Sequence, residues 1–523
     1  MPDPTPETVA APAPSRQAAR DKRHPFTRAL LATVASTALP GLGLVTAETR
    51  RTRALGWTIS GLVVAAGLAV IALGVFNLSA LASLAVRPRA LTAVSWTLAI
   101  SGFLWVCIIL GTHLVRRPRE LTGTQRAVGA FAVAGLSFLV AAPMAVAARY
   151  ATDQARLVTT VFKADGSKSE TRPTLDTTKP DVWANKPRLN ILLLGGDTTA
   201  ERIATIKDRP ILTDTIMVAS IDTKTGSMVL VQIPRNMAKT PFPAGTKLHT
   251  YYPRGFQGGP GADPAEYFAN AIWNNVPKSH PDALPNTDYP GADAMKLGIG
   301  EAIGLPIDYF VLLNIDGLQA LIDAMGGVTV NINERLPIAG NSERPQDTMG
   351  WLEPGPNQHL DGYRAMWYAR SRWSTDDFSR MSRQSCLVNA IVRQADPVTM
   401  LTRYEAIAQA SSQMVETDIP QSVLPAIVDV ALRTKAGAAK RVLFQHGIDG
   451  YDTTNPNFDM MRSRVEAALR PTPSASASPS SDTTTKAPTT SSGTKKPSQS
   501  ASSPPKTTQN IEDVCAYNPV KPK

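Results

Sequence analysis

Residues 189–197 read LNILLLGGD, and this stretch decides the fold of the middle of the chain. A short, continuous apolar run that ends in two glycines and an aspartate is typical of a buried strand leading into a loop. Two similar runs follow, TIMVASI at 215–221 and MVLVQI at 228–233, and the turn at 222–226 predicts a hairpin between them. We therefore expect a sheet that begins with residue 189.

Helix and strand patterns alternate beyond this hairpin. Apolar residues at helical spacing predict helices, and short apolar runs between turn residues predict strands. The expected helices cover 292–303, 316–325, 361–370, 381–395 and 460–469, and the expected strands cover 308–313, 328–332 and 441–444. Because the two kinds of element interleave, we predict an α/β domain with a central mixed sheet that helices cover on both faces.

The composition excludes several classes of protein. The chain has 523 residues, 43% hydrophobic and 19% charged, so it is neither wholly disordered nor fibrous. Of the formal net charge of +11, +10 lies in residues 1–150 and +3 in residues 471–523, which leaves −2 for residues 151–470. A nearly neutral domain has no basic surface that follows phosphates, so we predict no nucleic-acid partner. Three cysteines without a Cys-X-X-Cys pair exclude a Cys₄ zinc site.

Three uncharged stretches precede this domain, at residues 55–76, 90–115 and 127–148, with 22, 26 and 22 residues. About 20 apolar residues span a bilayer as a helix, so we predict three transmembrane helices and the membrane as a partner. A weaker stretch, 29–47, contains Pro40 and Gly41. We interpret it as a re-entrant or interfacial segment, and the alternative is a fourth span.

The basic residues indicate the orientation in the membrane. Lys and Arg are dense before residue 55 and between residues 116 and 126, whereas only Arg87 and Arg89 separate the first two apolar stretches. The positive-inside rule then puts residues 1–54 in the cytoplasm and everything after Arg149 outside. We expect a multi-pass protein of the cell membrane. Its extracytoplasmic domain covers residues 186–470 and follows a stalk at 149–185.

The C-terminal part changes character twice. Residues 471–510 contain 27 Ser, Thr and Pro among 40, so we expect a disordered linker that cannot bury enough apolar surface to fold. Residues 511–523 regain apolar side chains, among them Ile511 and Val514, and are expected to form a short docking segment.

Charged residues collect beside the expected strands. Asp197, Asp214 and Arg235 each lie at or near a strand end, where ligands bind in open α/β sheets. A second cluster follows downstream and contains Arg370, Arg372, Asp377, Arg380, Arg383 and Gln384. Arginine recognises phosphate through paired hydrogen bonds, and two aspartates suit a hard cation bound together with phosphates. These residue types leave two equal alternatives, a pyrophosphate site and a structural Arg–Asp network.

Several spaced motifs, in order over about residues 190–395, resemble the LytR-CpsA-Psr domain. They are LNILLLGGD, TDTIMVASID, GSMVLVQIPRN, GLPIDYFVLLNIDGLQALIDAMGGVTVNI, HLDGYRAMWYARSR and DFSRMSRQ. The resemblance implies an extracytoplasmic α/β/α domain preceded by transmembrane helices. It also implies a transferase that joins a glycopolymer from a polyprenyl-pyrophosphate carrier to the muramic acid C6 hydroxyl of peptidoglycan. The prenyl chain would lie in an apolar tunnel.

The resemblance also implies roles for individual residues. Asp197 and Asp214 match aspartates linked to catalysis and to binding of Mg²⁺ (or Mn²⁺). The arginines that match pyrophosphate ligands are Arg202, Arg235, Arg370 and Arg372, and the last motif adds Asp377, Arg380, Arg383 and Gln384, with partly structural roles.

Two positions depart from the commonest pattern of the family: Leu212, where many members have Arg, and Asn236, where many have Asp. They keep two alternatives open, a non-catalytic envelope protein that binds polyprenyl-linked polymers and a pyrophosphatase for the same carrier. A transcriptional regulator is disfavoured, because the sequence contains no helix-turn-helix signal.

The cysteines allow one further expectation. Cys386 and Cys515 would both lie outside the cell, where disulfides persist, whereas Cys107 falls within an expected span. We expect a disulfide between Cys386 and Cys515 that fixes the C-terminus to the domain. The alternative is two unpaired thiols.

Overall fold

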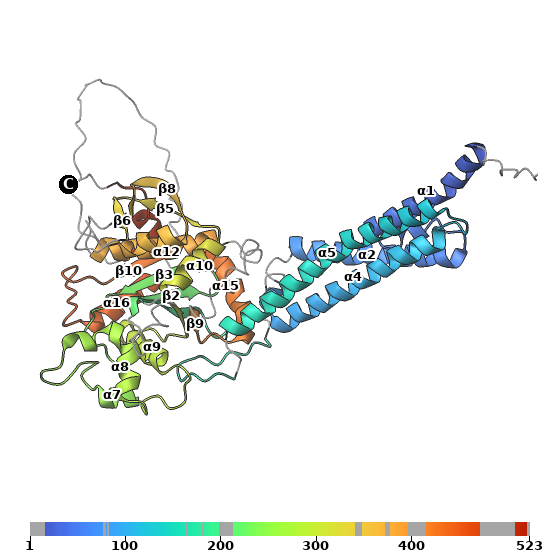
Figure 1. Cartoon of the computed structure of the whole chain (residues 1–523). Coiled ribbons are helices and arrows are strands. Elements are labelled where there is room, and N and C mark those ends of the chain that lie inside the picture. Colours follow the sequence, from blue (N-terminus) through green and yellow to red (C-terminus); the bar gives the residue numbers. More distant parts are fainter. Residues whose placement is uncertain are drawn as a thin grey trace, which may run out of the picture. The chain divides into compact units, whose positions relative to one another are not determined.

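The computed structural model describes residues 16–76, 80, 83–162, 166–179, 181–197, 213–339, 348–371, 377–395, 415–470 and 508–519. The chain forms two compact units, Met1–Arg156 and Leu157–Lys523. The first unit is built from helices and the second from a sheet with helices on both faces (Figure 1).

The helices of the first unit are α1 (Arg16–Ala38), the short η1 (Leu42–Leu44), α2 (Arg50–Phe76), α4 (Pro88–Arg116) and α5 (Gly123–Val161). Of these, α2, α4 and α5 are long and apolar enough to cross a membrane. Helix α5 continues past residue 148 into the expected stalk. Ion pairs of Asp153 with Arg149 (3.4 Å) and Arg156 (3.5 Å) lie one helical turn apart and stabilise this polar extension.

Residues 29–47 form a hairpin whose two arms lie beside the same end of α4. On the first arm, Thr33 Oγ1 lies 3.1 Å from His113 Nδ1, and the Ser36 carbonyl accepts from Trp105 Nε1 at 3.0 Å. On the returning arm, Arg116 donates to the Thr46 carbonyl at 3.0 Å. Followed from residue 33 to residue 46, the stretch contacts residue 113 of α4, then residue 105, and then residue 116. These side-chain contacts of the stretch with α4 all fall between residues 105 and 116.

The second unit contains a seven-stranded sheet in the order β11-β10-β3-β2-β1-β4-β9. Its strands are β1 (Arg188–Gly196), β2 (Thr213–Asp222), β3 (Met228–Ile233), β4 (Tyr309–Leu313), β9 (Val415–Thr417), β10 (Ala439–Leu443) and β11 (Thr508–Asn510). The pairs β1–β4 and β3–β10 are parallel, and the other neighbours are antiparallel. This mixed sheet confirms the predicted α/β fold.

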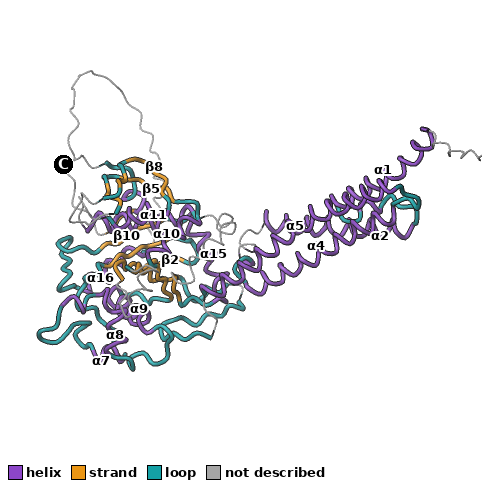
Figure 2. The backbone as a smooth tube through the Cα atoms, in the orientation of Figure 1, coloured by secondary structure: helices purple, strands orange, loops and turns teal. Residues whose placement is uncertain are grey.

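Helices cover both faces of this sheet (Figures 1 and 2). One layer holds α10 (Ile315–Ala324), α11 (Gly362–Arg370) and α12 (Asp377–Gln394), with α15 (Leu424–Ala436) packed against α12. The other layer holds α7 (Lys247–Tyr251), α8 (Ile272–Ser279), α9 (Pro290–Ile303) and α16 (Phe458–Leu469), with the single turns η2 (Pro264–Tyr267) and η3 (Ala269–Ala271). The first layer also carries two small sheets, β5 (Val328–Ile332) with β8 (Gly355–Leu360) and β6 (Leu336–Ile338) with β7 (Gly350–Leu352).

The domain contains two separate apolar cores, one of them against the central sheet. On the α9 side, Leu192, Val218 and Val231 pack with Met295 and Ile299, and all five side chains are fully buried. Strand β3 is buried at every residue, which explains why its sequence reads as an uninterrupted apolar run. A second core lies between the small sheet β5–β8 and the helices α10, α11 and α12.

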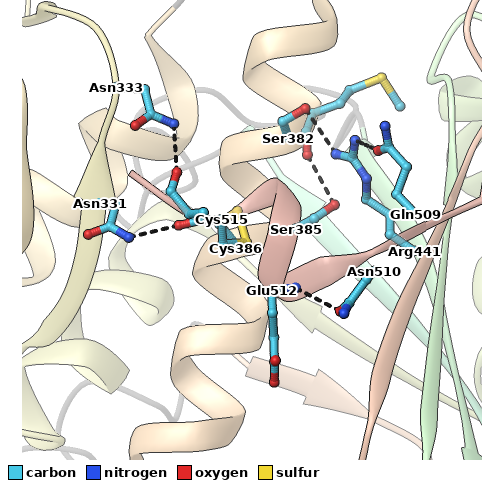
Figure 3. Close-up of a disulfide and its surroundings, with 12 residues drawn as sticks. Asn331, Asn333, Ser382, Ser385, Cys386, Arg441, Gln509, Asn510, Glu512 and Cys515 are labelled. Carbon is cyan, nitrogen blue, oxygen red and sulfur yellow. Dashed lines mark hydrogen bonds between the residues drawn. A yellow bond between two sulfur atoms is a disulfide. The ribbon is translucent and has the colours of Figure 1, made fainter. Parts of the chain in front are cut away.

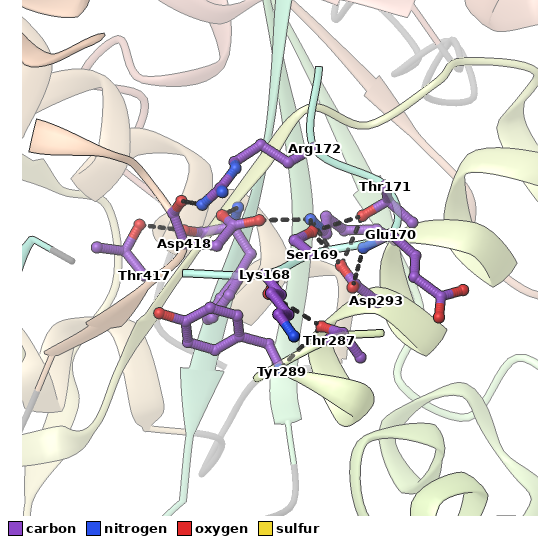
Figure 4. Close-up of polar contacts among 12 residues, drawn as sticks. Lys168, Ser169, Glu170, Thr171, Arg172, Thr287, Tyr289, Asp293, Thr417 and Asp418 are labelled. Carbon is purple, nitrogen blue, oxygen red and sulfur yellow. Dashed lines mark hydrogen bonds and ion pairs between the residues drawn. The ribbon is translucent and has the colours of Figure 1, made fainter. Parts of the chain in front are cut away.

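The chain between the two units does not form a separate stalk as far as residue 185. Residues 169–171 bind the buried carboxylate of Asp293 in α9 through Ser169 Oγ (2.8 Å), the Glu170 amide (2.9 Å) and Thr171 Oγ1 (2.6 Å). Figure 4 shows these contacts converging in the interior of the domain. The predicted stalk at 149–185 did not anticipate these contacts, because the partner of residues 169–171, an aspartate more than 120 positions away, is brought to them only by the fold.

The C-terminal segment is part of the same domain. Cys386 in α12 and Cys515 form a disulfide with a Cα–Cα distance of 5.5 Å, as the sequence analysis expects. Residues 508–510, assigned above to the disordered linker, instead form the edge strand β11, and the turn α17 (Ile511–Val514) follows it. The remainder of that linker, residues 471–507, lies outside the described residues.

Candidate functional site

The topology brings three strand ends to one edge of the sheet. Strands β1, β3 and β4 run in the same direction, so their C-terminal ends meet there, and the antiparallel β2 begins at this edge. Asp197 therefore follows β1, Arg235 lies just beyond β3, and Asp214 is the second residue of β2. All three line one cavity of about 420 Å³.

Asp214 and Arg235 form an ion pair across this edge. Arg235 NH1 lies 2.6 Å from Asp214 Oδ1, and about a third of each side chain is exposed (34% for Asp214 and 33% for Arg235). The pair is thus accessible from the cavity. Because both side chains are partly exposed, the pair contributes little to stability.

Helices α11 and α12 supply the facing wall. Arg370, the last residue of α11, is exposed and lines the cavity. Arg380, which is buried, and Gln384 line it from α12. Gln384 is fixed through its Oε1 atom, which accepts from Gln232 Nε2 of β3 at 3.2 Å. Helix α11 lies close to α10 because Gly362 has no side chain. A Cβ there would come within 2.2 Å of the Gln319 carbonyl oxygen.

The cavity also has an apolar wall that the sequence analysis did not identify. It is made by Leu313, Ile315 and Leu318 around the start of α10, Pro337 of β6, and Met366 and Trp367 of α11. Taken singly, these residues look like ordinary core positions, and no motif marks them. These residues line one cavity only because the fold brings together three elements that are far apart in the sequence.

The structure thus brings together six of the predicted site residues: Asp197, Asp214, Arg235, Arg370, Arg380 and Gln384. Arg202, Arg372 and the divergent Leu212 lie outside the described residues, and α12 begins at Asp377. Asn236 follows Arg235 and is exposed.

Arg383 has a different place from the other α12 residues. Its Nε donates to the Tyr368 carbonyl at 2.8 Å, one NH₂ group binds the Ser371 carbonyl, and the other lies 2.6 Å from Glu334. Only 8% of its side chain is exposed. We expected Arg383 in the substrate site, but it instead joins α12 to the end of α11 and so positions Arg370. Beside it, burial raises the pKa of Tyr368 far above its ordinary value.

Replacing Arg383 by alanine is expected to lower the free energy of unfolding by about 3–5 kcal/mol, because it leaves the Glu334 carboxylate and two carbonyls without their donor. Denaturant unfolding monitored by circular dichroism measures this change. The same substitution at Arg364, which is exposed on α11, should cost no more than about 0.5 kcal/mol. Equal stabilities of the two variants would contradict the structural role.

The acidic groups of the cavity match a magnesium ion better than zinc. Asp197 and Asp214 offer oxygen ligands only, and within the described ranges no three His, Cys, Asp or Glu side chains gather at one point. Mg²⁺ commonly takes one or two carboxylates and completes its shell with water and substrate phosphates. The two aspartates therefore fit a Mg²⁺ or Mn²⁺ ion that arrives with a phosphate ligand.

Comparison with known proteins identifies the class to which this fold and cavity belong. Residues 154–466, more than half of the chain, match the model of the LytR_cpsA_psr family, so the protein belongs to the LytR-CpsA-Psr family. This confirms the resemblance inferred from the spaced motifs.

Similar proteins share modest identity with this chain. Biofilm regulatory protein A of Streptococcus mutans is 24% identical over 255 residues, which are 47% of this chain and 54% of that protein. The polyisoprenyl-teichoic acid–peptidoglycan teichoic acid transferase TagU of Oceanobacillus iheyensis is 26% identical over 277 residues, 52% of this chain and 70% of TagU. The chain thus spans about half the length of the first relative. The crystal structure of Bacillus subtilis TagV is 20% identical with a TM-score of 0.37, and the match covers 55% of this chain and 99% of TagV.

Proposed function

We propose that this protein is a phosphotransferase that moves a glycopolymer from a polyprenyl-pyrophosphate carrier onto peptidoglycan. The observation that carries the proposal is that Asp197, Asp214, Arg235, Arg370 and Arg380 all line one cavity. Such a cavity suits a dianionic pyrophosphate that is neutralised by arginines and approached by carboxylates. The curated name of the TagU relative describes this kind of transfer for that protein.

The apolar wall supports the polyprenyl part of the donor. It adjoins the charged wall within the same 420 Å³ cavity, so one ligand can place phosphates on one side and hydrocarbon on the other. Leu318, Pro337 and Met366 offer no charged group, and contact with the first isoprene units would remove apolar surface from water. A free sugar phosphate would leave this wall uncovered.

The reaction exchanges one phosphorus–oxygen bond for another. The muramic acid C6 hydroxyl attacks the phosphorus next to the sugar, and the bond to the bridging oxygen breaks, so that polyprenyl phosphate leaves. Asp197 or Asp214 accepts the proton of the hydroxyl. Arg235 and Arg370 hold the phosphate oxygens while charge moves to the leaving group.

We further propose that the catalytic unit lies outside the cell and that the protein crosses the membrane three times. Because both arms of the 29–47 hairpin lie beside the same end of α4, this stretch adds no crossing. Three crossings support this proposal, because an odd number of crossings separates the domain from the arginine-rich N-terminal segment, which the positive-inside rule assigns to the cytoplasm.

Removal of divalent cations should reduce transfer at least about 100-fold, because a bound Mg²⁺ or Mn²⁺ held by Asp197 and Asp214 would neutralise the pyrophosphate. The rate is measured after EDTA treatment and after addition of Mg²⁺. Asp197→Asn should weaken this metal dependence. Undiminished transfer in EDTA would contradict the metal proposal and leave the arginine site intact.

The purified full chain in detergent, incubated with a polyprenyl-pyrophosphate-linked sugar, Mg²⁺ and a peptidoglycan oligomer, tests the function. Release of polyprenyl phosphate with sugar joined to the oligomer is the expected result. Release with the sugar phosphate left free would show a pyrophosphatase. Carrier binding without release would show a non-catalytic binding protein.

A further inference from the structure

The C-terminal segment, residues 508–519, contacts both the central sheet and the small sheet β5–β8. Its strand β11 pairs antiparallel with β10, with Thr508 opposite Val442. Beyond α17, the Cys515 carbonyl accepts from Asn331 Nδ2 at 2.9 Å, and the Ala516 carbonyl accepts from Asn333 Nδ2 at 3.2 Å. Figure 3 shows the segment crossing α12 between these anchor points.

The segment binds the side of α12 that faces away from the cavity. At about 100° per residue, Arg380 and Gln384 share one face of the helix, and Cys386 lies on nearly the opposite face. The first two line the cavity, whereas Cys386 bonds covalently to Cys515. A second link is the ion pair between Arg393 of α12 and Glu512, at 2.8 Å.

Arg441 provides a third connection between the segment and α12. This arginine of β10 is 1% exposed, and it donates to Ser382 Oγ of α12 at 2.9 Å and to Gln509 Oε1 of β11 at 2.5 Å. Its guanidinium lies 5.5 Å from the ring centre of Phe378, also in α12. Burial lowers the pKa of Arg441 to about 10, as expected for a cation that is held away from water.

The contacts of the segment indicate that it does more than cover the edge of the central sheet. A strand that only closes an edge needs the ladder to β10, which the three pairs of β11 already provide. The covalent bond and the ion pair are instead made to α12, and two further hydrogen bonds reach Asn331 and Asn333. The segment therefore holds α12 as well as closing the edge of the sheet at β10.

We propose that residues 508–519 are a covalently held positioning element that keeps Arg380 and Gln384 of α12 aligned with the pyrophosphate of the donor. This inference rests on the proposed function of the cavity. Cys515 and Arg441 act as positioning residues because they touch α12 and do not line the cavity, and Gln509 acts through Arg441. Without the segment, α12 would keep Arg380 and Gln384 less firmly in place at the cavity, and the donor would therefore bind more weakly.

Hydrogen exchange on the folded full chain in detergent tests the proposal without requiring activity. Tris(2-carboxyethyl)phosphine converts the disulfide to two thiols while the phosphine takes up oxygen from water and becomes the phosphine oxide. We expect at least about tenfold faster amide exchange in α12 after this reduction, and less than twofold change in α16 on the other face of the sheet. Cys515→Ser should behave like the reduced protein. Gln509→Ala, which keeps the disulfide, should show a smaller increase.

A matched control separates this effect from general destabilisation. Val465→Ala removes two methyl groups from a fully buried position in α16 and lowers the melting temperature without touching the segment. It should accelerate exchange in α16 and leave α12 protected. Where transfer is measurable, Cys515→Ser should raise the KM for the donor at least about fivefold, whereas Val465→Ala should not.

Two results would overturn the proposal. Faster exchange confined to β10 and β11, with α12 unchanged, would show that the segment only closes the sheet edge. An unchanged KM in active Cys515→Ser protein would show that α12 does not need the segment to bind the donor. If the oxidised wild type transfers nothing, the proposed function fails, and the exchange measurement still decides whether α12 is held.

Discussion

Replacing Arg370 by alanine is expected to reduce glycopolymer transfer about 10²–10³-fold, the usual loss when one preorganised donor to a developing charge is removed. Arg370 ends α11 at the cavity and is exposed, so the change removes little packing. The unfolding free energy should therefore stay within about 0.5 kcal/mol of wild type. The rate of polyprenyl phosphate release and a denaturant melt measure the two quantities.

Arg364→Ala is the matched control for Arg370. Both arginines are exposed on α11, but Arg364 is not among the residues that line the cavity. It should retain full activity. Arg370→Lys should fall between wild type and Arg370→Ala, because lysine keeps the charge but cannot form two parallel hydrogen bonds to a phosphate. Wild-type transfer by Arg370→Ala would remove this residue from the proposed site.

Replacing Lys296 by methionine is expected to give a large loss of stability, about 3–5 kcal/mol. The Lys296 ammonium is completely buried in α9, 2.9 Å from Asp293 and 2.5 Å from Asp418. Methionine fills much of the same volume but leaves two buried carboxylates without their cation. Denaturant unfolding measures the loss, and Lys278→Met, at an exposed position in α8, should change stability little.

The loss should also depend on pH. Burial already raises the pKa of Asp418, and Lys296 is the main group that opposes this shift. Without Lys296 the folded-state pKa of Asp418 rises further, and a raised carboxyl pKa contributes stability at low pH that is lost as the pH increases. Lys296→Met should therefore be less destabilised at pH 5 than at pH 8. Adding Asp418→Asn should recover part of the loss at pH 8, and no recovery would contradict the buried-charge explanation.

The central strands were predictable because burial leaves a long apolar signature. The predicted strand 228–233 coincides with β3 of the central sheet, and the predicted strand 328–332 coincides with β5 of the small sheet. Strands β9 and β11 have only three residues each, too few for a periodic pattern to emerge. Strand β8 was missed for another reason: four of its six residues are exposed, so its sequence GPNQHL reads as a loop.

Site residues could be predicted where the residue type itself indicates the chemistry. They could not be predicted where the role of a residue depends on how the helices pack. Asp214 and Arg235 follow from their places beside strand ends, and the structure pairs them. Arg380 and Arg383 could not be distinguished in sequence, because both are arginines in the same motif. Their different roles depend on the rotation of α12, which puts one in the cavity and the other against the end of α11.

The bond between Cys386 and Cys515 gives the chain a covalent ring. The two cysteines are 129 positions apart, and the Ser/Thr/Pro-rich residues 471–507 lie within this interval. A single proteolytic cut anywhere in that interval would leave both fragments attached to each other. The nicked protein would migrate as an intact chain on a denaturing gel until a reductant was added, so its C-terminal peptide could be shed only after two separate chemical events.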